Sequence, residues 1–297
     1  MADLRLHPFR IGVSIAALTA AFLVGTFTAG PTATEQEATT YRAPRSAYKD
    51  GRPDLSGIWM AMNTANWNLE DHEPGEYHPT IWRIGALFAF PGGQSVVEGG
   101  TIPYTPQALA TKKEKFENRL VADVYRPEVG DTELKCYLPG LPRATYMPYP
   151  FELVQADRFI HFNYVYAGAE RVVRMRKEEH TPSPVDTWMG WSNGRWDGET
   201  LEIEVTGFNG HGWLDRAGNF ISDRTKVTER YTRTGPDHLL YEATLEDPTI
   251  YARPWKISMP LYRKIDRAYV PIEYRCIALS EEALYGRLTK IGERPTK

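Results

Sequence analysis

The second half of the chain, from residue 150 to residue 277, is divided into short segments in which apolar and polar residues alternate. Segment 201–205 reads Leu-Glu-Ile-Glu-Val, the period of a β-strand with one buried face. Asp197-Gly198 stands just before it and is typical of a two-residue hairpin turn. Because no helical pattern separates these segments, a parallel sheet built from crossover helices is not expected.

The spacing of these segments predicts seven or eight consecutive strands with short connections, preceded by a first strand at 55–60. They include segments 151–155, 160–166, 201–205, 224–233, 239–246, 255–263 and 271–277. A meander of this size removes its free edges by closing into a barrel. The predicted fold is therefore mainly β, an antiparallel barrel with one or two peripheral helices, and a two-sheet β-sandwich is the alternative.

One helix is predicted over residues 106–121, because Thr105 is a good N-cap and Pro106 suits the first helical position. Leu109, Phe116 and Leu120 should mark its buried side. A short helical turn is expected from Ser280 to Gly286.

The N-terminus has the order of a secretory signal: Arg5 and Arg10, then an apolar segment over 11–24, then small residues to Ala33. The apolar segment is shorter than the ~20 residues that span a bilayer. We therefore expect residues 1–33 to be a signal peptide, with an uncleaved anchor as the alternative. Residues 34–54 should be a linker or surface wrap and residues 55–297 a single β-rich domain, periplasmic or secreted.

Composition narrows the classes of partner. The formal charge of -3 lacks the basic excess of a general nucleic-acid binder, and 42% hydrophobic with 25% charged residues is ordinary for a globular protein. A small-molecule ligand is the expected partner. Neither nucleic acid nor, after signal cleavage, a membrane is expected, and the oligomeric state is left open.

The chain has two cysteines, Cys136 and Cys276. In an oxidising compartment two cysteines often pair, and a bridge closing so long a loop could add roughly 3–5 kcal/mol. The alternative is two separate buried thiols.

Two resemblances support the fold and the export. Gly57-Ile58-Trp59 resembles the Gly-x-Trp opening of lipocalin-type (calycin-type) barrels. Segments 143–151, 188–201 and 206–220 resemble a family of exported bacterial proteins without a characterised function. The second resemblance implies export and a single β-rich domain, and it transfers no catalytic residues.

The densest polar cluster is segment 206–223, which contains four glycines. His211 and Asp215 could form an oriented acid/base pair there, and Arg216 could bind substrate. Alternatively, the polar groups of this loop satisfy one another's backbone.

Segment 143–149 is the second candidate. Arg143 could bind a carboxylate, and the phenols of Tyr146 and Tyr149 could donate hydrogen bonds to a ligand. The alternative is a proline-rich lid over the core. We predict that this segment and the 206–223 loop meet at one rim of the barrel, where functional groups concentrate on a rigid scaffold.

Glu229 shares a strand face with Val227 and Tyr231, so it should point into the barrel and could act as an acid or base. An inverted register, or an ion pair with an arginine, is the alternative. The indoles of Trp188, Trp196 and Trp213 could line a site for a planar ligand, or could simply be core.

No zinc, nucleotide or serine-hydrolase motif is present in the sequence, so no metal and no cofactor is expected. The favoured function is the binding of an apolar or aromatic small molecule inside the barrel. The alternative is a cofactor-independent lyase, isomerase, hydratase or hydrolase acting on such a molecule in the same cavity.

Overall fold

The computed structural model describes residues 41–48, 51–76, 89–266 and 268–280. The expected signal peptide at 1–33 and most of the expected helical turn from Ser280 to Gly286 lie outside these residues.

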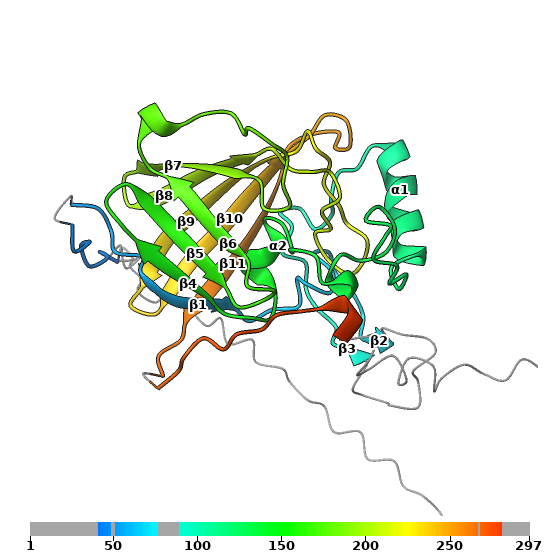
Figure 1. Ribbon diagram of the computed structural model, residues 1–297, viewed down its shortest axis with the longest axis horizontal. Coiled ribbons are helices and arrows are strands. Elements are labelled where there is room, and N and C mark those ends of the chain that lie inside the picture. The colour runs from blue at the N-terminus through cyan, green and yellow to red at the C-terminus, as the bar shows by residue number, and fades with distance from the viewer. Residues whose placement is uncertain (1–40, 49–50, 77–88, 267, 281–297) are drawn as a thin grey trace, which may run out of the picture. The chain divides into compact units, whose positions relative to one another are not determined.

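Nine strands of the described chain form a closed barrel in the order β1-β11-β10-β9-β8-β7-β6-β5-β4 (Figure 1). Their bounds are β1 Gly57–Ala61, β4 Phe151–Gln155, β5 Phe159–Tyr164, β6 Glu170–Arg174, β7 Trp191–Asp197, β8 Thr200–Thr206, β9 Lys226–Gly235, β10 His238–Glu246 and β11 Trp255–Arg263. This confirms the predicted lipocalin-like barrel and excludes the sandwich. A separate small sheet pairs β2 (Gly75–Glu76) with β3 (Ala89–Phe90).

The barrel is mixed rather than wholly antiparallel, because β6 and β7 run parallel. Their pairing covers only Val173↔Ser192 and Arg174↔Asn193. Residues 175–190, which include the 3₁₀ helix η3 (Lys177–Glu179), carry the chain back along the barrel before β7 begins. The β6–β7 seam is therefore the shortest ladder in the closed sheet.

The expected strand at 271–277 does not form. Only Tyr274 makes a bridge there, to Tyr166. The physical reason is that β11 already pairs with β1, so the closed barrel has no edge on which a further strand could add.

The predicted first helix is α1, Pro106–Glu117, with the Thr105 side chain accepting from the backbone N–H of Ala108. Its buried residue is Ala108, whereas Leu109 and Phe116 are exposed, so the expected buried side was wrong. α1 lies outside the barrel (Figure 1).

The two ends of the barrel are closed differently. At the end with the tight hairpins, the Gln155 side chain accepts from the Leu55 N–H, and Arg233 donates to the Asp54 carbonyl. At the other end lies α2, Arg143–Tyr146, all four residues of which are buried (Figure 1). α2 and the loops around it position the groups described next. No helix among the described residues is long and apolar enough to cross a membrane.

Candidate functional site

The barrel interior contains a carboxylate. Glu229 on β9 is fully buried between Val227 and Tyr231, as the strand period predicted. Its Oε1 accepts hydrogen bonds from the Tyr241 hydroxyl at 2.8 Å and the Tyr231 hydroxyl at 3.1 Å. Its Oε2 accepts from Arg171, which forms the buried ion pair left open as an alternative.

Arg171 extends inward from β6 and joins three strands. Its Nε donates to the Ser192 Oγ of β7 at 2.8 Å, and its guanidinium lies 5.1 Å from the centre of the Phe162 ring. Burial alone would lower the pKa of Arg171, but the nearby Glu229 carboxylate raises it above its ordinary value. The arginine is therefore charged, and its charge is balanced by Glu229.

Two hydrogen-bond donors in this interior lack an acceptor. The Tyr164 hydroxyl and the Arg171 Nη1 are both shielded from solvent, and neither makes a hydrogen bond of good geometry with a described residue, although the side chains of Thr145 and Arg171 lie close enough to the Tyr164 hydroxyl to act on its pKa. The two groups interact electrostatically, and burial raises the pKa of Tyr164, so its phenol remains a donor at neutral pH. Buried donors without partners are costly and uncommon in folded proteins.

Aromatic rings surround these donors. Phe162 packs against Phe151, Tyr164 and Tyr231, with ring centres 5.5 to 6.1 Å apart, and the centres of Tyr231 and Tyr241 are 4.9 Å apart. Thr145 of α2 covers the cluster, with its Oγ1 3.4 Å from the Tyr231 hydroxyl. The inward side chains thus give this part of the barrel apolar walls around a polar centre.

Arg143 is fully engaged by protein groups. Its guanidinium donates to Asp131, Glu133 and Asn66 at distances of 2.6 to 3.0 Å. Glu133 is also paired with Arg216, whose guanidinium lies 4.0 Å from the ring centre of Trp67. These pairs form a buried network beside α2, and the predicted substrate-binding roles of Arg143 and Arg216 stay predictions.

Asp215 is an anchor of its loop. Its carboxylate accepts from the backbone N–H groups of Leu69, Ala217 and Asn219 and from the Asn219 side chain. No described hydrogen bond joins it to His211, whose ring lies instead 6.0 Å from that of Trp188. The geometry is that of the alternative reading, a loop whose polar groups satisfy one another.

The two candidate segments do meet, as predicted. The Tyr146 hydroxyl of α2 donates to the Leu214 carbonyl at 2.7 Å. Burial raises the pKa of Tyr146, so this phenol is a structural donor. The meeting point is buried, so it builds the end of the barrel instead of an open rim.

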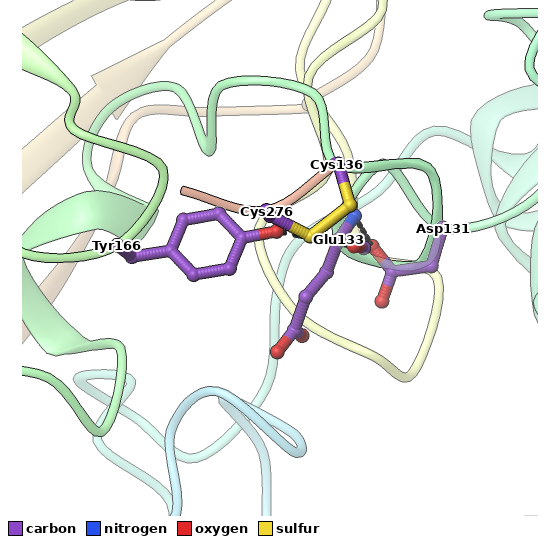
Figure 2. The surroundings of a disulfide bond; sticks show 5 residues. All are labelled: Asp131, Glu133, Cys136, Tyr166 and Cys276. Carbon is purple, nitrogen blue, oxygen red and sulfur yellow. Dashed lines mark hydrogen bonds between the residues drawn. A yellow bond between two sulfur atoms is a disulfide. The ribbon is translucent and has the colours of Figure 1, made fainter. Parts of the chain in front are cut away.

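A disulfide between Cys136 and Cys276 pins the C-terminal segment beside this end, which confirms the predicted pairing (Figure 2). Figure 2 also shows Tyr166 reaching toward Glu133, to whose backbone carbonyl its hydroxyl donates at 3.1 Å. Tyr149 stacks on Tyr274 with ring centres 5.4 Å apart. Burial, with Tyr274 close by, raises the pKa of Tyr149 to about 12.

The predicted tryptophans do not share one site. Trp188 stacks on Tyr137, Trp196 is half-buried against the core, and Trp213 is buried beneath Lys115.

The sequence analysis did not name Arg171, Tyr164, Tyr241, Ser192 or Thr145 as site residues. The sequence did contain a signal for Arg171, because residues 171 and 173 are two positions apart on one strand and therefore point to the same face as the inward Val173. No cluster of the described residues could hold a metal ion. Comparison with protein-family models and with curated proteins finds no match to this sequence.

Proposed function

We propose that this protein binds an apolar or aromatic small molecule inside its barrel, and that one oxygen atom of the ligand accepts hydrogen bonds from Tyr164 and Arg171. The observation that carries the proposal is the pair of buried donors, neither of which makes a hydrogen bond of good geometry within the described residues. A ligand oxygen would remove the cost of leaving both donors unpaired, and the surrounding rings suit an apolar body.

The charges of Arg171 and Glu229 determine which kind of ligand oxygen fits between the walls of the barrel. Glu229 already neutralises Arg171, so a ligand carboxylate would bring an uncompensated negative charge into the interior. A neutral carbonyl oxygen carries no such penalty. The proposed ligand is therefore a ketone, aldehyde or ester with an apolar or aromatic frame.

Entry of a ligand requires a local opening, because both donors are shielded from solvent. The β6–β7 seam pairs at two positions only, and Arg171 itself lies on β6. Separating β6 from β7 breaks fewer hydrogen bonds than separating any other pair of neighbouring strands in the barrel. The opening formed in this way lies beside β6, the strand that carries Arg171. We assign entry to the seam for this reason.

An acid/base enzyme in the same interior is the second candidate function, and one observation favours it. Two donors aimed at a carbonyl oxygen would stabilise the enolate formed on proton removal, and the Glu229 carboxylate adjoins them. Such an enzyme would exchange the α-protons of a bound ketone with solvent. Deuterium incorporation in D₂O, followed by NMR, separates this function from binding alone.

The disulfide also supports the proposed export, because structural disulfides are typical of oxidising compartments.

The binding proposal is tested by titrating the protein with matched pairs of probes while following tryptophan fluorescence. Suitable pairs are camphor with bornane and acetophenone with ethylbenzene. We expect each ketone to bind about tenfold more tightly than its hydrocarbon, the effect of one or two net hydrogen bonds. Tyr164→Phe should remove most of that difference, whereas Tyr146→Phe, which changes a phenol outside the donor pair, should retain it. No saturable response, or equal affinity for both members of each pair, would contradict the proposal.

A further inference from the structure

The outer face of the barrel carries a groove of about 700 Å³ over β7, β8 and β9. Its floor is made of outward-facing side chains of the three strands, and residues 180–182 form one wall. This volume is within the range of small-molecule sites.

The middle of the floor is a row of three polar side chains in register across the strands. Asn193 of β7 pairs with Glu204 of β8, which pairs with Thr228 of β9. Neighbouring strands are ~4.8 Å apart, so the row spans roughly 10 Å and presents an amide, a carboxylate and a hydroxyl in line.

The groups of this row are largely unused by the described part of the protein. The Asn193 Oδ1 is buried without a hydrogen-bond partner, and its Nδ2 makes only a long contact of 3.4 Å to the Thr181 carbonyl. Neither the Glu204 carboxylate nor the Thr228 hydroxyl has a side-chain hydrogen bond or ion pair with a described residue.

The next row along the same face is different. Arg195 and Arg230 both pair with Glu202 there, and Arg230 also reaches Asp197. Its charges are therefore compensated within the sheet. Within the groove, the unpaired polar groups therefore belong to the Asn193 row, whereas the charges of the Arg195 row are paired.

The chemistry of the lining indicates the class of ligand. Both cationic and anionic side chains line the groove, so its electrostatic potential is not of one sign and favours neither a phosphate nor a polycation. Amide, carboxylate and hydroxyl groups together both donate to and accept from hydroxyl groups. Trp191 lies in register with Thr206 at one end of the groove, where its half-buried indole stacks against the Arg174 guanidinium, 3.3 Å from the ring centre.

We infer that this groove is a second binding site, separate from the interior, for a neutral hydroxyl-rich ligand, a short oligosaccharide. Asn193, Glu204 and Thr228 hydrogen-bond its hydroxyls along the row. The site depends on no part of the proposed interior function.

The inference is tested by isothermal titration calorimetry of the full chain with maltotriose, cellotriose and chitotriose. We expect saturable binding of at least one trisaccharide. Asn193→Ala and Thr228→Val should each weaken it about tenfold, the effect of one lost hydrogen bond to the ligand. Threonine and valine are both good strand residues, so the second variant preserves the sheet.

The matched control is Thr244→Val on β10. Thr244 pairs with Thr228 in the same row but lies one strand beyond the groove lining, so this variant should bind the trisaccharide as the wild type does. Tyr164→Phe should also leave this binding unchanged, which separates the groove from the interior.

Three results would overturn the inference: no saturable binding of any of the three trisaccharides, unchanged binding in both groove variants, or an equal loss in Thr244→Val. Binding of heparin or spermidine in place of the neutral probes would likewise show that the groove recognises charge.

Discussion

Arg171 of β6 and Glu229 of β9 form an ion pair inside the barrel, where their side chains are 2% and 0% exposed. The two residues are 58 positions apart in sequence, and because β6 and β9 are not neighbouring strands, their side chains meet inside the barrel through the curvature of the sheet. Ser192, Tyr231 and Tyr241 make further hydrogen bonds to the pair, which helps a buried ion pair to be tolerated, and the Arg171 Nη1 is left without a well-formed hydrogen bond among the described residues.

Breaking this pair should be costly. Glu229→Gln leaves the Arg171 charge buried without a counter-ion, so we expect a loss of about 3–5 kcal/mol in the free energy of unfolding, measured with urea. The double variant Arg171→Met, Glu229→Gln should lose less than the sum of the two single variants. Lys226 lies on β9, as Glu229 does, and forms a partly exposed ion pair with Glu246 of β10, so Lys226→Met should cost about 1 kcal/mol or less. Equal losses at the two sites would contradict the account of the centre.

Removing the Tyr164 hydroxyl should not lower the free energy of unfolding, in contrast to breaking the Arg171–Glu229 pair. Tyr164→Phe deletes a buried hydroxyl without a partner, so the free energy of unfolding should stay the same or rise. Tyr146→Phe deletes a hydroxyl that donates to the Leu214 carbonyl and should cost about 1–3 kcal/mol. A large loss in Tyr164→Phe would show that its hydroxyl has a structural partner.

The disulfide should contribute strongly to stability. Cys136 and Cys276 are separated by 140 residues, and constraint of so long a loop in the unfolded chain is worth about 4–5 kcal/mol. The oxidised protein should show no free thiol under denaturing conditions, and reduction should lower its melting temperature. Two titratable thiols in the purified protein would be the contrary result.

Glu133 should make the free energy of unfolding depend on pH in the acidic range. Burial opposes its ionisation, but Arg216 and Arg143 lower its pKa to about 2, from 4.5 for an unperturbed carboxyl. The unfolded chain therefore takes up a proton first as the pH falls. The stabilisation is present above pH 4.5 and is lost between pH 4.5 and pH 2.

The test of this prediction is urea unfolding across that pH range. Glu133→Gln should flatten the dependence by up to a few kcal/mol. If the variant and the wild type lose stability in parallel, another carboxylate dominates the acid transition.

The alternation of apolar and polar residues was sufficient to predict most strands of the barrel and which of their side chains point inward. The alternation in β8 and β9 placed Leu201, Ile203, Val227 and Glu229 inward, as the structure has them. The parallel β6–β7 pair was not predictable, because it depends on the path of residues 175–190, which follow no period. The segment at 271–277 has the composition of a strand, but whether it pairs depends on a free edge, which local sequence does not encode.

The candidate site was only half accessible from sequence. Glu229 could be placed inward, whereas its partner Arg171 depended on which strands face one another across the interior of the barrel. Arg143 and Asp215 are residue types that often form functional sites, yet both are bound by other protein groups. Arg143 donates to Asp131, 12 positions away, and Asp215 accepts from Leu69, 146 positions away. Residue type indicates what a group can do, and only the fold decides whether that capacity is still available.

The central claim is that a ligand carbonyl accepts hydrogen bonds from Tyr164 and Arg171 inside the barrel. The most direct measurement is the infrared stretching band of a ¹³C-labelled carbonyl in bound acetophenone, compared between wild type and Tyr164→Phe. Hydrogen bonds to the oxygen weaken the carbonyl bond. The account predicts a band at lower frequency than that of acetophenone in hexane, and a partial return toward the hexane value in the variant. A band at the hexane position, or the same band in both proteins, would contradict it.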